Sequence, residues 1–398
     1  MSATDSVAKL RDIRTQMKAE VVERGVEIDL LIAAIVARVH MILLGPPGVA
    51  KSLMVDQFLS HIEGATLFSH LLNKNTPPEA LFGPVSMIGL KEDSFRRVTT
   101  GALPEANLAF IDEIFKSNAT NLNGMLKIIN ERKFENDGGM VDVPLWSVIG
   151  ASNELPTHDR EDLVAFSDRL GIRRIVSPVR TDDGITQVLM GQLARNQGGG
   201  LTEEHTMITR DELEALQGAA TQISVPGRVQ ALIVTLYQKA EQENLHLSMR
   251  RIGEGVKLCQ ANALLAGNGE VKAEDLRLFE HILWNDPEEI EIAQGLTLDF
   301  AGTVGKQAAR ARTAYEEQRK RLSDAQSKMP SDVNVEPEKD VVNDLTTVSA
   351  QLRALDEKVE KDIEQATEEG HDPSELESIQ AEVRRSRQSV RETMGMDF

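Results

Sequence analysis

The sequence is poor in cysteine, in aromatic residues and in long apolar runs. Its single cysteine, Cys259, excludes an internal disulfide, which fits a reducing compartment and predicts a cytoplasmic protein. The apolar run at 30–44 is interrupted by Arg38 and His40, so it is too short and too polar to span a bilayer. The first residues lack the basic-then-apolar order of a signal peptide.

Excess positive charge is absent as well. The 398 residues carry a formal net charge of −19, whereas a nucleic-acid-binding domain usually shows a basic patch. Aromatic residues make up only 4% of the chain, which leaves few side chains on which single-stranded bases could stack. The composition therefore argues against broad contact with nucleic acid, although a local basic stripe would escape this test.

What the chain does contain is a strand, a glycine loop and a helix in succession. Residues 40–44 read as a buried strand that ends at Gly45, and residues 51–62 read as a helix. An amphipathic helix at 5–24 and an apolar helix at 27–39 are expected before the strand. This order is the context that a phosphate-binding loop requires.

The glycine loop reads Gly-Pro-Pro-Gly-Val-Ala-Lys-Ser and has the chemistry to hold a chain of phosphates. Gly45 and Gly48 allow a turn whose backbone N–H groups point at the phosphates. Lys51 supplies a positive charge, and the Ser52 hydroxyl is a ligand for Mg²⁺. Ala50 replaces the glycine that usually precedes the lysine, which weakens the motif when it is taken alone. The loop residues expected to contact a nucleotide, ATP above all, are Gly45, Pro46, Pro47, Gly48, Val49, Ala50, Lys51, Ser52 and Leu53.

A second motif supplies two carboxylates. Residues 108–111 read as a buried strand, and Asp112 and Glu113 follow it directly. A strand buried on both faces holds its last residues rigidly, so Asp112 can hold Mg²⁺ while Glu113 orients and deprotonates the attacking water. Asn153, after a strand at 146–149, can position the same water through its amide. The alternatives are a surface Asp–Glu pair and an asparagine in an ordinary turn.

The order of the elements predicts the fold. Strands alternate with helices up to about residue 178, which indicates an α/β fold with a parallel sheet between helices. Hairpin insertions are expected at 84–103 and 133–144. After residue 178 the strands stop and helices are expected at 182–194, 210–223, 226–244, 250–266 and 273–283. The predicted domains are a phosphate-loop core (1–180), a helical lid (181–297), a helical connector with a linker (298–337) and an acidic helical hairpin (338–398).

The C-terminal hairpin is predicted from a heptad pattern of apolar residues. They recur at alternating spacings of four and three, at Val341, Leu345, Val348, Leu352, Leu355 and Val359. The proline-bearing segment 330–337 reads as a linker, and the pattern breaks at 370–373 before it resumes at Leu376. Acidic side chains outnumber basic ones here, which is typical of a solvated coiled coil. A docking arm for a partner is the alternative.

Taken together, these motifs resemble one known family, the MoxR-type AAA+ ATPases, and within it the RavA-like group. The matching stretches lie at 44–52, 77–84, 100–106, 110–116, 129–132 and 151–156. Alanine before the lysine is usual in this family, so Ala50 becomes support for the motif. The resemblance covers roughly residues 5–285 and does not extend to the tail from about 300 onward. It implies an AAA+ core with hairpin insertions and a helical lid.

Membership would also imply a hexameric ring, because ATP lies between neighbouring subunits in this family. An arginine from the next subunit then stabilises the transition state. The sequence Phe-Ser-Asp-Arg at 166–169 points to Arg169 as that arginine finger, with Arg173 and Arg174 as alternatives.

The family's lid carries a further arginine that senses the nucleotide, called sensor 2. Residues 248–251, Ser-Met-Arg-Arg, resemble this element, and Arg250 is preferred over Arg251 as the nucleotide contact. Family members act on other proteins as chaperone-like remodellers, often with partners that contain a von Willebrand factor A domain. Such a partner is an analogy and is not shown by these residues.

Three functions are therefore compared. The first is a ring-forming ATPase that remodels protein partners, with Lys51, Glu113, Asn153, Arg169 and Arg250 in the hydrolysis site. The second is a nucleic-acid motor, since replicative helicases share the insertion pattern, but the net charge of −19 argues against it. The third is an assembly scaffold in which ATP binding sets assembly and hydrolysis is incidental.

Overall fold

The computed structural model describes residues 3–156, 160–179, 182–196, 205–300, 303–329, 339–368 and 373–394. The chain forms two compact units, Met1–Thr297 and Leu298–Phe398, and each is described by itself. The linker expected at 330–337 lies outside the described residues, as do residues 370–372 of the expected break. None of the described helices is long and apolar enough to cross a membrane.

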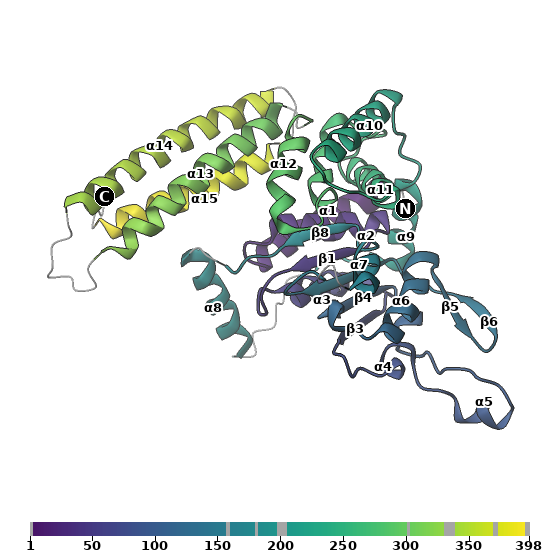
Figure 1. The fold of residues 1–398 in the computed structure, drawn as a ribbon. Helices are drawn as coiled ribbons and strands as arrows, with labels where there is room; N and C mark the ends of the chain where they lie inside the picture. Colours follow the sequence, from purple (N-terminus) through teal and green to yellow (C-terminus); the bar gives the residue numbers. More distant parts are fainter. Residues whose placement is uncertain are drawn as a thin grey trace. The chain divides into compact units, whose positions relative to one another are not determined.

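The first unit begins with the phosphate-loop core, whose strands and helices alternate (Figure 1). Its first six elements are α1 (Ala3–Glu20), α2 (Gly25–Ala37), β1 (Met41–Leu44), α3 (Lys51–Ser60), β2 (Ile62–Glu63) and β3 (Leu67–Leu71). Then follow α4 (Pro78–Phe82), α5 (Met87–Lys91), η1 (Leu103–Glu105), β4 (Leu108–Asp112), η2 (Ile114–Lys116), α6 (Ala119–Glu131), β5 (Lys133–Asn136), β6 (Gly139–Asp142), β7 (Ser147–Ser152), α7 (Glu161–Ser167) and β8 (Ile172–Ile175).

The core sheet has five parallel strands in the order β3-β4-β7-β1-β8. Every residue of β1 and β7 is buried, because helices cover both faces of these inner strands. The predicted α/β fold is therefore confirmed. Two strands, β3 and β8, were not predicted: Ser69, His70, Arg173 and Arg174 interrupt their apolar pattern.

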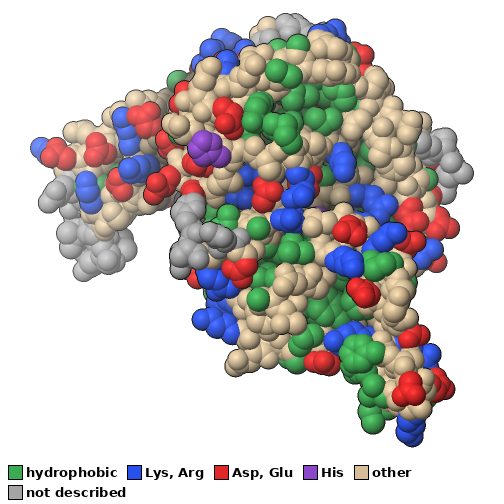
Figure 2. Space-filling model, turned by 45° about the vertical axis from the view of Figure 1, so that its right-hand side comes forward, with side chains coloured by type: hydrophobic (Ala, Val, Ile, Leu, Met, Phe, Trp, Pro, Cys, Tyr) green, Lys and Arg blue, Asp and Glu red, His purple; other side chains and the backbone are tan. Residues whose placement is uncertain are grey.

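Two insertions project from the core at the same end of the sheet (Figure 1). The one expected at 84–103 is not a regular hairpin: a single antiparallel bridge joins Val85 to Arg97, and α5 lies between them. The other forms the expected hairpin of β5 and β6. The Asn136 side chain accepts from the backbone N–H of Arg97 at 2.7 Å and donates to its carbonyl at 3.1 Å, which ties the two insertions together. Figure 2 shows apolar side chains at the tip of this projection, and the exposed apolar residues there are Met87, Ile88, Leu90 and Phe95.

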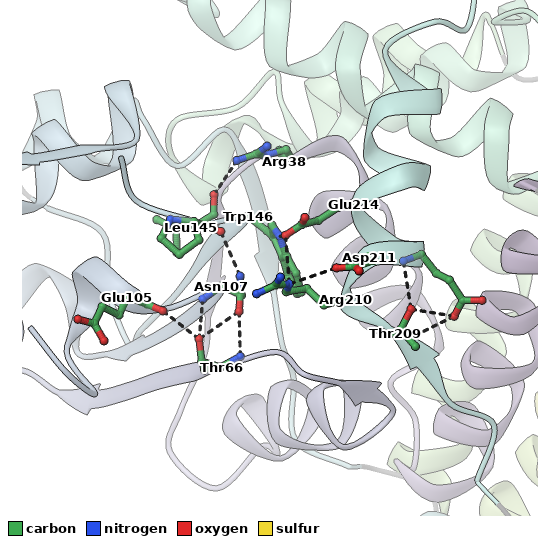
Figure 3. Close-up of polar contacts among 12 residues, drawn as sticks. Arg38, Thr66, Glu105, Asn107, Leu145, Trp146, Thr209, Arg210, Asp211 and Glu214 are labelled. Carbon is green, nitrogen blue, oxygen red and sulfur yellow. Dashed lines mark hydrogen bonds and ion pairs between the residues drawn. The ribbon is translucent and has the colours of Figure 1, made fainter. Parts of the chain in front are cut away.

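The amino ends of the strands are held by satisfied polar contacts (Figure 3). The buried Asn107 side chain accepts hydrogen bonds from the backbone and the hydroxyl of Thr66, at 3.0 and 3.1 Å. The Trp146 indole, which precedes β7, donates to Glu214 of helix α9 at 3.3 Å. These hydrogen bonds fix the amino ends of the strands. In such folds a ligand is expected at the opposite edge of the sheet, where the carboxyl ends of the strands lie.

The remainder of the first unit is mainly helical. It contains α8 (Asp182–Asn196), β9 (Ile208–Thr209), α9 (Arg210–Ala220), α10 (Gly227–Gln242), α11 (Met249–Leu265), η3 (Ala273–His281), η4 (Pro287–Glu289) and α12 (Ile290–Leu298). The expectation that strands stop after residue 178 is wrong in one detail, because β9 pairs in parallel with β2. A two-residue strand carries too short a pattern to be read from sequence. Cys259 is buried on α11.

The second unit is a bundle of three helices, α13 (Thr303–Ser327), α14 (Lys339–Glu368) and α15 (Ser374–Thr393). The heptad residues of α14 are buried against α15, so the predicted hairpin is present. The segment 298–337, however, is more than a connector, because Ala308, Tyr315 and Leu322 of α13 belong to the same apolar core. A helix was expected here, but its small and widely spaced apolar residues concealed its part in the apolar core. The Tyr315 hydroxyl lies 3.0 Å from that of Ser386 on α15.

Candidate functional site

The strand order brings three chain segments to one edge of the sheet. Strand β7 lies between β1 and β4, and all three are parallel. The glycine loop follows β1, Asp112 ends β4, and Asn153 follows β7, so all three leave the sheet at the same edge. The N–H of Gly45 also donates to the carbonyl of Ser152 at 3.0 Å, which ties the loop to the segment that bears Asn153.

The loop itself has a strained and closely packed backbone. Gly45 has a φ of +154°, and a Cβ atom built there would lie 2.2 Å from the carbonyl oxygen of Val176. Gly48 has a φ of +81°, and Ala50, at +66°, adopts the left-handed conformation although it has a Cβ. Such strain is concentrated at ligand sites, where the surrounding structure holds it in place. Helix α3 begins at Lys51, so the N–H groups of its first turn face the same edge.

The Lys51 side chain contacts the backbone at the carboxyl ends of strands β1 and β7. This side chain is buried, and Nζ donates to the carbonyls of Gly45 at 2.6 Å and Ser152 at 3.5 Å. Burial lowers the pKa of Lys51, and the charges of Asp112 and Glu113 oppose that shift. The charges of both carboxylates therefore reach Lys51.

Glu113 and Asn153 are in direct contact. The amide nitrogen of Asn153 donates to Oε1 of Glu113 at 3.2 Å. Glu113 has a φ of +52°, a left-handed conformation that ends the extended backbone of β4. Its backbone N–H donates to Oδ1 of Asp112 at 2.9 Å, and Lys116 lies 3.1 Å from its carboxylate. A carboxylate and an amide held together in this way can orient a water molecule.

The oxygen atoms of Ser52 and Asp112 suit a magnesium ion. Mg²⁺ prefers oxygen ligands and is usually bound through one or two protein groups, water and substrate phosphates. Ser52 is exposed in the first turn of α3, and Asp112 is half-buried at the end of β4. No group of three or more histidine, cysteine or acidic side chains that could hold a metal occurs among the described residues. A site completed by nucleotide phosphates fits this donor set better than an all-protein cage.

The three candidate fingers lie in different environments. Arg173 is 4% exposed and donates to the carbonyl of Asn285 at 2.9 Å. Arg174 forms an ion pair of 2.8 Å with Glu27. Arg169 is only half-buried and contacts the carbonyl of Ala165. Of the three, Arg169 is the one that is both partly exposed and without an ion pair among the described residues.

The two lid arginines also differ. Arg251 is completely buried and donates to the carbonyl of Trp284 at 2.8 Å, and burial lowers its pKa well below the ordinary value. Arg250 is exposed, and its Nη1 lies 3.4 Å from Oδ2 of Asp168. Burial, and then the charge of Arg250, lower the pKa of Arg169, so these two arginines are neighbours. Among the described residues, no hydrogen bond or ion pair joins either of them to the loop or to Glu113.

One residue that supports the loop was missed by the sequence reasoning. Arg24, at the start of α2, is buried, and its Nε donates to the carbonyl of Val49 at 3.1 Å while Nη2 donates to that of Ser177 at 2.6 Å. Binding these carbonyls holds the loop with its N–H groups free to meet a ligand. A lone arginine between two helices has no sequence signal for such a role.

Arg24→Ala should weaken ATP binding by roughly tenfold, because one charge-assisted hydrogen bond to the loop contributes about 1.5 kcal/mol. Titration with ATP measures the change. Arg11→Ala is the matched control, since Arg11 also donates two hydrogen bonds to a carbonyl, that of Leu265, away from the loop. If both variants bind ATP equally well, Arg24 does not support the loop.

Comparison with known proteins places the chain in a family. Residues 8–218, more than half of the chain, match the description "MoxR domain in the MoxR-vWA-beta-propeller ternary systems", and residues 228–296 match an AAA lid domain. Two uncharacterized proteins of Methanocaldococcus jannaschii are both 36% identical to the chain. The matches cover 75% and 70% of this chain, and 76% and 72% of those proteins.

The fold has a solved counterpart. A candidate ATPase from Cytophaga hutchinsonii aligns with a TM-score of 0.59 at 15% identity, over 74% of this chain and 94% of that one. At this identity the likeness shows the fold alone. The match over 8–218, the lid match and the 36% identity together show the family, and ATP hydrolysis is its general reaction. The chain belongs to the MoxR family of AAA+ ATPases.

Proposed function

We propose that this chain is one subunit of an ATP-hydrolysing ring that remodels protein partners. The observation that carries the proposal is the contact of 3.2 Å between Asn153 and Glu113, beside the loop that holds Lys51. A carboxylate in this position can accept a proton from water while the amide orients that water. The arrangement supports hydrolysis of ATP in addition to binding.

In the proposed mechanism, the residues of one subunit bind the nucleotide and activate the water. The N–H groups of the loop and of the first turn of α3 cradle the phosphates, and Nζ of Lys51 exchanges its carbonyl partners for phosphate oxygens. Mg²⁺, which Ser52 and Asp112 would hold, neutralises phosphate charge when it is bound. Glu113 then accepts the proton of the attacking water.

In the proposed ring, a hexamer, a neighbouring subunit provides a further positive charge that stabilises the transition state. Arg169 supplies it to the nucleotide of the neighbouring subunit, which is supported by its partly exposed side chain. Arg250 contacts the γ-phosphate of its own subunit, so the lid responds to the nucleotide. Arg173, Arg174 and Arg251 are engaged in other contacts and are proposed to be structural.

The proposed clients are proteins. The name of the matching family places its MoxR domain in systems with a von Willebrand factor A domain protein, and we propose such a partner for this chain. The net charge of −19 makes nucleic acid an unsuitable substrate. The exposed apolar tip formed by Met87, Ile88, Leu90 and Phe95 is suited to contact apolar segments of a protein.

Finer assignments belong to the same proposal. We place the chain in the RavA-like group of the family, and in the cytoplasm, which fits its single buried cysteine. We also propose a core at 1–180, a lid at 181–297 and a C-terminal bundle, in which α13 joins the hairpin at 338–398. This C-terminal bundle would serve as a docking arm.

If the apolar tip contacts clients, an unfolded model protein should stimulate ATP turnover several-fold, and Phe95→Ser should remove that stimulation while basal turnover remains. Phosphate release measures both rates. Val234→Ser, which changes an exposed apolar residue of α10, is the matched control.

Single- and double-stranded DNA at physiological salt should leave turnover unchanged, and a large stimulation by DNA would favour a nucleic-acid motor instead.

A further inference from the structure

A junction between core and lid lies beside the proposed finger. Ser248 is the N-cap of α11, and its hydroxyl donates a hydrogen bond of 2.9 Å to Oδ1 of Asp168. Arg250, two residues further along, places Nη1 3.4 Å from Oδ2 of the same carboxylate. Since Asp168 immediately precedes Arg169, one carboxylate joins the lid arginine to the finger segment.

The charge of Asp168 acts on a cluster of arginines. Burial lowers the pKa values of Arg169, Arg173 and Arg251, and in each case the negative charge of Asp168 opposes that shift. Arg250 is its direct ion-pair partner. The charge of Asp168 therefore acts on four guanidinium groups from the core and the lid, and Arg250 is the one in direct contact.

The contacts at this junction are of two kinds. Arg173 and Arg251 are buried and both bind Asn285, so breaking either contact would leave a charge without water or a partner. The pair of Arg250 and Asp168 differs, because their side chains remain 44% and 29% exposed. Water can replace a partner at this position at little cost. The junction thus combines permanent contacts with one that can be exchanged.

We propose that Asp168 is a positioning residue that holds Arg250 beside the finger and competes for it with the γ-phosphate of ATP. This inference rests on the proposed role of Arg250 as a phosphate contact. A guanidinium turned toward Asp168 is not turned toward the phosphate, so ATP binding must first release it. Once Arg250 leaves, the negative charge of Asp168 acts more strongly on Arg169. ATP binding in one subunit thereby changes the electrostatic environment of Arg169, the finger that serves the next subunit.

The test is a double-mutant cycle on ATP affinity, measured by equilibrium titration in a Glu113→Gln background that prevents turnover. Asp168→Asn keeps the acceptor for Ser248 but removes the competing charge, so ATP should bind about two- to fivefold more tightly. Adding Arg250→Ala should abolish this gain, because no guanidinium remains to be released. Glu270→Gln removes an ion pair of 2.7 Å with Arg228 elsewhere in the lid and should leave the affinity unchanged.

Unchanged or weaker ATP binding in Asp168→Asn overturns the proposal, and so does a gain that persists without Arg250. A merely structural Asp168 would lower the unfolding temperature without tightening ATP binding. Asp168→Glu restores the charge and should return the affinity toward that of the wild type. Failure of the proposed function looks different, because the Glu113→Gln background would then fail to bind ATP or would continue to hydrolyse it.

Discussion

Glu113→Gln should retain ATP binding and lose steady-state hydrolysis by about 10²–10⁴-fold, the range over which a general base contributes to rate. Glutamine preserves the size of the side chain and can still meet the amide of Asn153, which lies 3.2 Å away. It cannot accept the proton of the attacking water. Phosphate release measures the loss of turnover, and titration with ATP measures the retained binding.

The matched control for this prediction is Glu131→Gln, which neutralises an exposed carboxylate at the end of α6. It should leave both binding and turnover unchanged. Normal turnover in Glu113→Gln would show that another group activates the water, whereas lost ATP binding would show that the charge of Glu113 is needed to organise the loop. Either result would contradict the role proposed for this residue.

Arg169→Ala should lower turnover by about 10³–10⁵-fold, the contribution of an arginine finger to phosphoryl transfer. The phosphate loop of the same subunit is intact in this variant, so ATP binding should persist. Turnover is measured by phosphate release. Arg210→Ala, which removes a half-exposed arginine at the start of α9, is the control and should hydrolyse ATP normally.

Mixing two inactive variants tests whether the finger acts between subunits. In a ring assembled from equal amounts of Arg169→Ala and Glu113→Gln subunits, about one seam in four pairs an intact base with an intact finger. The mixture should therefore recover about a quarter of wild-type turnover, although each variant alone is inactive. If no turnover returns while mixed rings form, the finger acts within its own subunit.

The gathering of the candidate site residues at one edge of the sheet was largely predictable, because these residues follow buried strands. Apolar runs located β1, β4 and β7, and the polar residues after them could then be assigned to one edge of a parallel sheet. The contact between Asn153 and Glu113 follows from that topology. What could not be predicted were strands with mixed patterns, such as β8 with its two arginines, and the packing of the expected helical connector, α13, into the apolar core of the bundle.

Choices among neighbouring arginines required the tertiary structure. Arg250 and Arg251 are adjacent in sequence, yet α11 turns one into the interior and leaves the other exposed. Arg24 binds a backbone carbonyl of the loop, and Asp168 forms an ion pair with Arg250, which is distant in sequence. Contacts of these two kinds leave no periodic pattern in the sequence. The groups proposed to react thus carry a sequence signal, whereas the residues proposed to position them do not.

The order of strands in the sheet also affects how a subunit matures. The loop after β1 is complete by Ser52, but β7, which lies between β1 and β4, is synthesised about a hundred residues later. Until β7 inserts, Asn153 cannot meet Glu113, and the carbonyl of Ser152 cannot bind the N–H of Gly45. A chain emerging from the ribosome therefore contains the phosphate loop long before it can hydrolyse ATP, so ATP consumption begins only after the core has folded.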